Sequence, residues 1–491
     1  MNKRDLLAYQ LLQFFSQNNV KPISTSSLAE IFNTTPYKIE ASIATLNADL
    51  QAITANDQSV FISEKNYKGM WDSHNLFQIV VDKIKLYYIE RSTSFRAMEY
   101  LLFYNDLITP KRYIPKAFSS RAVFYRQLTL VKQLLTDEFD SLDIQTDKDR
   151  EFQIRLEIIE LYEQIYKGLK EPFPELDPLI NGIFDALKPF FKHQLQHGEK
   201  FKLSIFLRIW ILRHNNHKYV RLTAPNLFKD QRYDQIYRVL KQTLGWHFKL
   251  TNSEMLFLYG FLLNQEYLDY VGVPKAAFNY QLINQITDDF LTWLKTFNVL
   301  VEFPAEVEQA LRRDLTNVNL KLFSYYAELL DATYKKSVHT LQENYPTFDI
   351  LIRRFWQNLA KQPEVQAYHL NKYNLYYGYM LALVNNIPPK YSRDRVRVVI
   401  DFSRGSLYSQ YVDNTLKSLY GKNVILTNHL EPKSDLFLSD TYSYKIKIPQ
   451  LIWKSFPTVS DWTNLITIIK EIRSTKANHF LNNQQKGRQK I

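Results

Sequence analysis

The sequence predicts a mainly helical, multidomain protein with a small α/β domain near its C-terminal end. The chain of 491 residues exceeds the size at which a single hydrophobic core keeps growing. Only 11 residues are glycine and 45% are hydrophobic, which is typical of a well-packed chain rather than a disordered one. From residue 395, β-branched runs such as RVRVVIDF replace the long helical patterns that precede them.

Periodicity and turn residues divide the chain into five segments. We expect a winged helix-turn-helix module over 1–70, a linker helix and a second such module over 71–170, helical bundles over 171–285 and 286–390, and an α/β domain over 391–491. The prolines of KEPFPELDP mark the linker before the bundles. Strands that alternate with helices in the last segment indicate a mainly parallel sheet.

Basic residues are concentrated in one stretch. The net charge is +12, but residues 1–170 carry as many acidic as basic side chains, so the excess lies in 171–491. Between Asp106 and Asp137 there is no acidic residue. The basic residues of this stretch are Lys111, Arg112, Lys116, Arg121, Arg126 and Lys132. This local concentration, more than the net charge, indicates a nucleic-acid contact.

The second half of the basic stretch predicts an amphipathic helix over 121–135, with Ser119 or Ser120 as its N-cap. Helical spacing places Phe124, Leu128, Val131 and Leu135 on one apolar stripe. The opposite arc carries Arg121, Tyr125, Arg126, Thr129, Lys132 and Gln133. Such a helix can lie in a DNA major groove, where Arg reaches base edges and Lys holds phosphates. An ordinary surface helix with a solvated charged face is the alternative interpretation.

The first segment predicts a helix-turn-helix in SLAEIFNTTPYKIEASIATLNADL, with Pro36 at the first position of the second helix. We expect the exposed face of that helix to offer Tyr37, Lys38 and Ser42 to DNA. The following SVFISEKNYKG predicts a β-wing whose Lys65 touches phosphate. The pattern repeats after a connecting helix over Trp71–Arg91, with a second wing expected in DSLDIQTDKDREFQI, residues 140–154.

Several chemistries are excluded by the sequence. The chain has no cysteine, which removes disulfides, thiolate catalysis and cysteine-based metal sites. It contains no G-x-x-x-x-G-K-S/T, G-x-S-x-G or H-E-x-x-H pattern. We therefore expect no enzyme, cofactor or metal. No apolar run is long enough for a membrane span, and the amphipathic N-terminus lacks a cleavage site, so a cytoplasmic protein is expected.

This order of parts resembles the Mga/AtxA family of transcriptional regulators. The resemblance covers essentially the whole chain and rests on the architecture, the SLAEIFNTTPYKIEASIATLNADL motif and the basic SSRAVFYRQL helix. It implies that the bundles are phosphotransferase-system regulation domains and that the last domain is similar to a sugar-permease enzyme IIB. It also implies binding to double-stranded DNA as a homodimer or larger assembly, and activation of virulence or metabolic genes.

The resemblance further implies regulation by histidine phosphorylation from phosphotransferase-system proteins, for which His214, His217 and His339 are the candidates. Alignment on Gly405 places Phe402 where enzyme IIB carries its phosphocysteine, so phosphoryl transfer by this domain is excluded. An RNA-binding antiterminator is the alternative function, because similar helical domains occur there. Its RNA-binding part is a β-rich domain, whereas residues 1–150 indicate helices.

Overall fold

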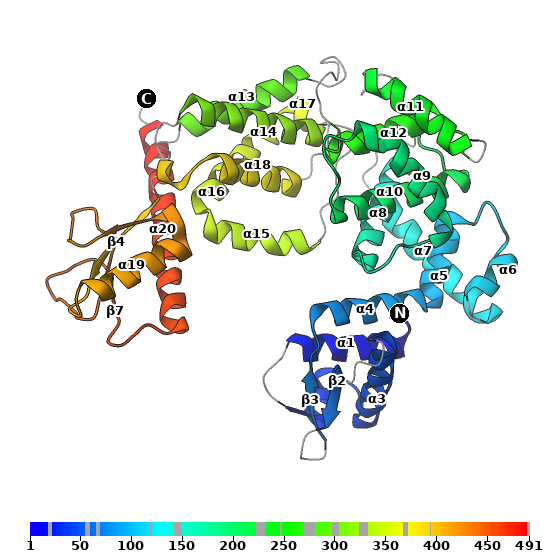
Figure 1. Ribbon diagram of the computed structural model, residues 1–491, viewed down its shortest axis with the longest axis horizontal. Helices are drawn as coiled ribbons and strands as arrows, with labels where there is room; N and C mark the ends of the chain where they lie inside the picture. The colour runs from blue at the N-terminus through cyan, green and yellow to red at the C-terminus, as the bar shows by residue number, and fades with distance from the viewer. Residues whose placement is uncertain are drawn as a thin grey trace. The chain divides into compact units, whose positions relative to one another are not determined.

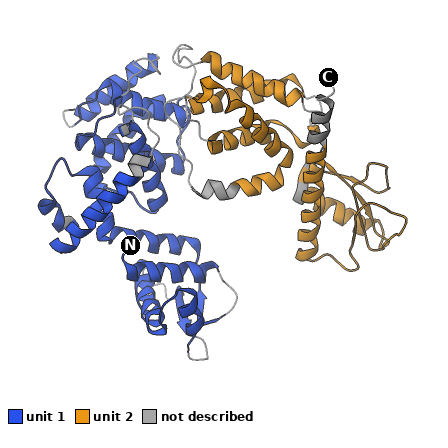
Figure 2. Ribbon diagram, turned by 180° about the vertical axis from the view of Figure 1, so that it is seen from behind, with its two compact units in different colours: residues 1–273 blue, residues 274–491 orange. Residues whose placement is uncertain are grey.

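The computed structural model is mainly helical, with a small parallel sheet near the C-terminal end (Figure 1). It describes residues 1–17, 22–54, 59–64, 69–117, 120–141, 150–221, 231–245, 248–268, 280–296, 304–323, 332–366, 372–392 and 394–488. The chain forms two compact units, residues 1–273 and 274–491 (Figure 2). The expected boundary between the bundles, at residue 285, lies within helix α13, Tyr280–Thr296.

The first part of unit 1 combines four helices with a small antiparallel sheet. Its elements are α1 (Lys3–Gln17), β1 (Ile23–Ser24), α2 (Thr25–Ile31), α3 (Pro36–Ile53), β2 (Phe61–Glu64), β3 (Met70–His74) and α4 (Gln78–Glu90). The strand order is β1-β3-β2, and both pairings are antiparallel. The expected helix over Trp71–Arg91 is therefore shorter, because the segment begins in β3.

The turn between α2 and α3 follows from its residues. Asn33 takes a φ of 46°, a left-handed conformation that asparagine tolerates better than most residues. Thr35 then caps α3, its hydroxyl accepting from the Lys38 N–H at 3.4 Å, and Pro36 takes the first helical position. This short turn lets Leu28 and Ala29 of α2 join the core formed by α1, α3 and α4.

A second helical group follows in unit 1. It consists of α5 (Thr93–Phe103), α6 (Pro110–Tyr113), the 3₁₀ helix η1 (Ile114–Ala117), α7 (Arg121–Ser141) and α8 (Arg150–Tyr166). Aromatic side chains fill the space between α5, α6 and α7: the Tyr113 ring lies 5.2 Å from that of Tyr100 and 5.9 Å from that of Phe124. Helices α5, α6, η1 and α7 thus share one core.

The second wing expected over 140–154 is wrong where the structure describes it. Residues 140–141 belong to α7 and residues 150–154 to α8, while residues 142–149 lie outside the described part. The physical reason is burial at helical spacing: Phe152, Arg155 and Ile159 of α8 are all buried. A helix brings these three to one side, whereas a strand would alternate them across two faces.

The rest of unit 1 is a helical bundle. Its elements are η2 (Pro174–Leu176), α9 (Asp177–Leu187), η3 (Lys188–Phe190), α10 (His197–Asn215), α11 (Gln231–Leu244) and α12 (Asn252–Asn264). Residues 203–214 of α10 and 254–264 of α12 are buried on every side, as expected for central helices.

A buried ion pair joins α8 to α12. The Arg155 and Glu254 side chains are both 0% exposed, and the Arg155 Nη1 and Nη2 donate to Glu254 Oε2 and Oε1 at 2.7 and 2.9 Å. The carboxylate also accepts from Trp210 Nε1 at 2.7 Å and from the Val220 N–H at 3.1 Å. Four donors thus compensate the burial of one carboxylate.

Acid is expected to weaken this unit through Glu254. Burial raises the pKa of Glu254, but the field of Arg155, the His214 ring 3.5 Å away and the hydrogen bonds from Arg155 and Val220 outweigh it and lower that pKa to about 2. A lowered pKa contributes stability above the unfolded value, near 4.5, and loses it as the pH falls towards 2. The contribution is on the order of 3 kcal/mol.

Thermal unfolding of wild type and Glu254→Gln between pH 7 and pH 3 measures this contribution. We expect the Tm of the wild type to fall more steeply below pH 4.5 than that of the variant, which lacks the titrating group. Parallel Tm curves for the two proteins would contradict the assignment.

Unit 2 begins with a second bundle. Its elements are α13 (Tyr280–Thr296), α14 (Ala305–Phe323), α15 (Ala332–Asn344), α16 (Pro346–Leu359), α17 (Pro363–Gln366), α18 (Lys372–Asn386) and η6 (Pro389–Tyr391). A buried polar chain crosses its core: Tyr379 Oη donates to Asn319 Oδ1 at 2.9 Å, and Asn319 Nδ2 donates to Thr287 Oγ1 at 3.0 Å. The chain fixes α13, α14 and α18 against one another.

The α/β domain closes unit 2. It consists of β4 (Val396–Asp401), α19 (Ser406–Tyr420), η7 (Gly421–Asn423), β5 (Val424–Thr427), β6 (Leu436–Ser439), β7 (Gln450–Ile452) and α20 (Val459–Arg488). The strand order is β5-β4-β6-β7 with every pairing parallel, which confirms the expected parallel sheet. Alternate residues of β4, including Val396 and Val398, share one core with α19 and α20.

A second buried ion pair ties this domain to the bundle of unit 2. Asp394 precedes β4, and Arg473 of α20 donates to its Oδ2 at 3.0 Å; both side chains are almost fully buried. Arg473 Nη1 also donates to the Asn344 carbonyl oxygen at 2.8 Å. The Asp394 carboxylate further accepts from Thr347 and Ser392 at 3.0 and 2.5 Å.

Candidate nucleic-acid interface

Helix α7 has the two faces that its sequence predicts. Phe124 and Val131 are buried, and Leu128 and Leu135 pack against the same core. The opposite arc is exposed: Arg121, Tyr125, Arg126, Thr129, Lys132 and Gln133. Ser120 caps the helix, accepting from the Val123 N–H at 3.4 Å. The Arg121 guanidinium lies over the Tyr125 ring, 5.8 Å from its centre, so the first turn presents a cation next to an aromatic ring.

The cations of α6 and α7 lack carboxylate partners within the described part of the chain. The exposed side chains concerned are Lys111, Arg112, Arg121, Arg126 and Lys132. The arginines that hold the fold together behave differently: Arg91, Arg155, Arg208, Arg213 and Arg473 are each bound to at least one carboxylate. The positive charge of α6 and α7 is therefore available to an external anion. The Lys116 side chain is outside the described residues.

Helix α3 offers a smaller and less charged face. Tyr37 is 79% exposed, and Lys38, Glu40, Ala41 and Ala44 are exposed beside it. The expectation that Ser42 lies on this face is wrong, since its side chain is 7% exposed. Ser42 lies three positions after the buried Ile39 and four before the buried Leu46, so helical geometry carries it to the core side. The remaining small residues leave the α3 backbone accessible to a close surface.

The β2–β3 hairpin is fixed against α2 and α3. Asn47 of α3 donates from Nδ2 to the Ile62 carbonyl oxygen at 2.7 Å and accepts from the Ile62 N–H at 2.9 Å. On the other strand, Trp71 Nε1 donates to Thr25 Oγ1 at 2.9 Å. These bonds set the position of the hairpin relative to α3. Lys65, expected to touch phosphate, lies outside the described residues.

Arg4 is a basic residue near α3 that the sequence reasoning missed. Its Nη2 donates to Thr45 Oγ1 at 3.0 Å, and the side chain is exposed. The contact joins residues 41 positions apart. The only signal in the sequence is the Lys3-Arg4 pair at the start of α1, and it does not reveal which helix lies opposite.

The C-terminal end of α10 holds the end of α5. Arg213 Nη1 and Asn216 Nδ2 both donate to the Leu102 carbonyl oxygen, at 2.7 and 3.2 Å. The Asp106 N–H donates to Asn216 Oδ1 at 3.0 Å. These bonds connect the first bundle to the group that contains α7.

The three candidate histidines differ in accessibility. His214 is 5% exposed and stacks on Phe248 with ring centroids 3.8 Å apart, so a phosphoryl donor cannot reach it in this conformation. His217 is exposed and pairs through Nδ1 with Tyr219 Oη at 3.0 Å. His339 is exposed beside Glu343, 3.2 Å from its Oε1. Phe402 is buried between Tyr408 and Trp453.

Comparisons with known proteins do not assign a family. No protein-family model matches the sequence, and a search of curated proteins finds no match. Among the described helices, none is long and apolar enough to cross a membrane. The residues that the structure describes contain no group of three or more histidine or acidic side chains that could hold a metal ion.

Proposed function

We propose that this protein is a DNA-binding transcriptional regulator. The observation that carries the proposal is the exposed basic arc of α6 and α7, whose cations lack carboxylate partners in the described chain. Protein cations that meet DNA phosphates contribute most of the sequence-independent affinity. Arg121, Tyr125, Arg126 and Thr129 would face the major groove, while Lys111, Arg112 and Lys132 would hold phosphates.

The first part of unit 1 supports a second contact. Helices α1–α3, the four-residue turn between α2 and α3 and a hairpin fixed on α3 support the proposal of a winged helix-turn-helix, which is built from such parts. In that arrangement α3 enters the groove through Tyr37 and Lys38. Two modules on one chain, doubled in a homodimer, would bind far more tightly together than either module alone, because the second contact forms at a high effective concentration.

Regulation of transcription is the function that such a chain would serve. The bundle of unit 1 is bonded to α5, so a signal received there has a physical route to the proposed DNA contact. His217 and His339 are the candidate phosphorylation sites that remain accessible, and phosphotransferase-system proteins are the corresponding partners.

Fluorescence anisotropy on duplex DNA across a salt series tests the proposal. We expect wild type to bind with a steep negative dependence of log K on log salt concentration. Arg121→Ala combined with Arg126→Ala removes two proposed contacts. It should lower the affinity by at least about tenfold, because each lost base contact costs about 1–3 kcal/mol. Lys38→Ala, which removes one groove contact from the first module, should lower the affinity by a smaller factor.

Arg238→Ala combined with Lys241→Ala is the matched control, because it removes two exposed charges from α11. Its DNA affinity and salt slope should stay close to those of wild type. Equal binding by the α7 variant and this control would refute the proposed role of α7. Binding to structured RNA in preference to duplex DNA would instead favour an RNA-binding antiterminator.

A further inference from the structure

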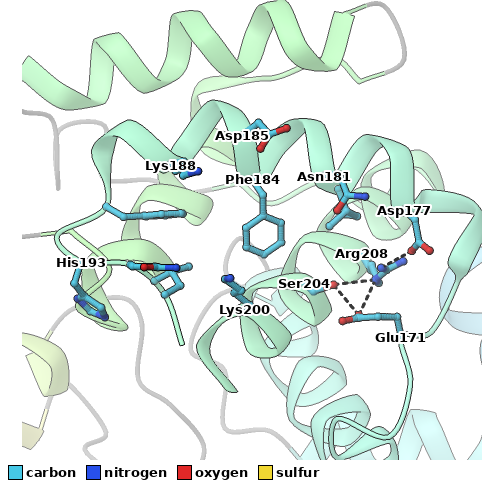
Figure 3. A pocket seen from close by; sticks show the side chains of 14 residues that line it. Glu171, Asp177, Asn181, Phe184, Asp185, Lys188, His193, Lys200, Ser204 and Arg208 are labelled. Atoms are coloured by element: carbon cyan, nitrogen blue, oxygen red, sulfur yellow. Dashed lines mark hydrogen bonds and ion pairs between the residues drawn. The ribbon is translucent and has the colours of Figure 1, made fainter. Parts of the chain in front are cut away.

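A pocket of about 830 Å³ lies between α9 and α10 in the first bundle (Figure 3). It is separate from the surfaces of α3 and α7, and the proposed DNA contact makes no use of it. Its size is within the range of small-molecule sites in proteins. Phe184 points into the middle of the pocket, between two groups of polar side chains.

The first polar group is built around Arg208. Its Nη2 donates to Asp177 Oδ1 at 2.7 Å and its Nη1 to the Phe173 carbonyl oxygen at 2.7 Å. Glu171 Oε2 lies 3.3 Å from Arg208 Nε. Because Arg208 is held in this way, the two carboxylates have fixed positions. They remain 42% and 48% exposed, so they can still accept hydrogen bonds from a ligand. Asn181 adds an exposed amide at the same end.

The second polar group is cationic. Lys188, at the start of η3, and Lys200 of α10 both line the pocket (Figure 3). Neither ammonium group makes an ion pair or hydrogen bond within the described part of the chain. His193 adjoins them, with its Nε2 3.0 Å from Glu199 Oε1. The acidic residues nearest in sequence to this end are Glu199, directly before Lys200 and bound to His193, and Asp185, one turn before Lys188.

We infer that this pocket binds a small phosphorylated polyol. Two unpartnered ammonium groups at one end suit a phosphate dianion. At the other end, fixed carboxylates and an amide suit hydroxyl groups, which donate hydrogen bonds to such oxygens. The ring of Phe184 between them provides an apolar surface for the C–H face of a sugar ring.

The arrangement disfavours simpler ligands. A bare anion satisfies the lysines but leaves the carboxylate end solvated, whereas a cation meets the carboxylates but is repelled by Lys188 and Lys200. A molecule with charge at one end and hydroxyls at the other satisfies both ends, so its affinity should exceed that of phosphate or of the uncharged sugar.

Isothermal titration calorimetry of the full-length protein, without DNA, tests the inference. The probes are glucose 6-phosphate, ribose 5-phosphate and glycerol 3-phosphate, each compared with inorganic phosphate and with glucose. We expect at least one phosphorylated probe to bind with a Kd of about 1 mM or tighter. Lys188→Ala combined with Lys200→Ala should weaken that binding by at least about tenfold, and Asn181→Ala should weaken it while sparing inorganic phosphate.

Lys241→Ala combined with Lys249→Ala is the control for charge, because it removes two exposed lysines of the same bundle that do not line the pocket. No binding of any phosphorylated probe up to about 10 mM would overturn the inference. So would equal affinity for inorganic phosphate, or equal loss in both double variants. The titration contains no DNA, so its outcome is independent of the proposed regulatory function.

Discussion

Replacing Arg155 by methionine is expected to lower the free energy of unfolding of unit 1 by about 3–5 kcal/mol. Methionine fills much of the space of the arginine side chain, but it leaves the Glu254 carboxylate fully buried without its cation. The remaining donors, Trp210 Nε1 and the Val220 N–H, are neutral. Native-state hydrogen exchange of the α10 and α12 amides measures the loss locally, without assuming that the whole chain unfolds in one step.

A double substitution separates the buried charge from the lost volume. Arg155→Met with Glu254→Gln removes both charges and keeps an acceptor oxygen for Trp210 or Val220, so it should recover most of the lost stability. The exposed pair of Lys295 and Glu308 serves as a surface reference, and breaking it with Lys295→Ala should cost less than about 1 kcal/mol. A comparably small effect for Arg155→Met would contradict the buried pair.

Arg473→Met is expected to have an effect of similar size, about 3–5 kcal/mol, in unit 2. The change leaves Asp394 buried with only the hydroxyls of Thr347 and Ser392 as donors. It also removes the bond from α20 to the Asn344 carbonyl oxygen. Because α20 belongs to the α/β domain, the loss should appear both in the exchange of its amides and in those of α16.

The neighbouring Lys470 provides the comparison. Its Nζ lies 3.1 Å from Glu343 Oε2 on a more exposed part of α20, so Lys470→Ala should cost less than about 1 kcal/mol. Equal hydrogen-exchange protection of the α16 amides in Arg473→Met and Lys470→Ala would mean that the buried Asp394 carboxylate is not stabilised by Arg473. It would contradict the buried ion pair.

Helices with one clear apolar stripe were predictable from the sequence. Phe124, Leu128, Val131 and Leu135 recur at helical spacing, and the structure places all four toward one core. The parallel sheet was also predictable in its class, because β-branched strands alternate with helices. In both cases the signal is local, and burial follows from the periodicity itself.

Short segments with mixed patterns were not predictable. DREFQI fits alternation over a few residues, but its continuation into a long helical repeat decides the conformation. The run YKIKI, residues 444–448, alternates polar and apolar residues as a strand does, but it forms a turn and irregular backbone, and the edge strand lies at Gln450–Ile452. Short alternating runs carry little information when the neighbouring strand that would pair with them is unknown.

The sequence predicted which residues form the candidate site, but it did not predict which distant residues they contact. The basic arc of α7 follows from the absence of acidic residues between Asp106 and Asp137. The contacts of Arg4 with Thr45 and of Asn47 with Ile62 join distant segments, so no local pattern encodes them. Ser42 was misplaced because its small side chain fits either face of a helix.

Helix α10 contacts both the pocket and α5, so it can couple ligand binding to DNA binding. Its first turns line the pocket through Lys200 and Ser204, while its last turn and C-cap hold α5 through Arg213 and Asn216. Any coupling between the two ends is reciprocal: an occupant that weakens DNA binding by a given factor must itself bind the DNA-loaded protein more weakly by the same factor. Under the proposed function, bound DNA would then shift the concentration of pocket ligand at which the protein responds.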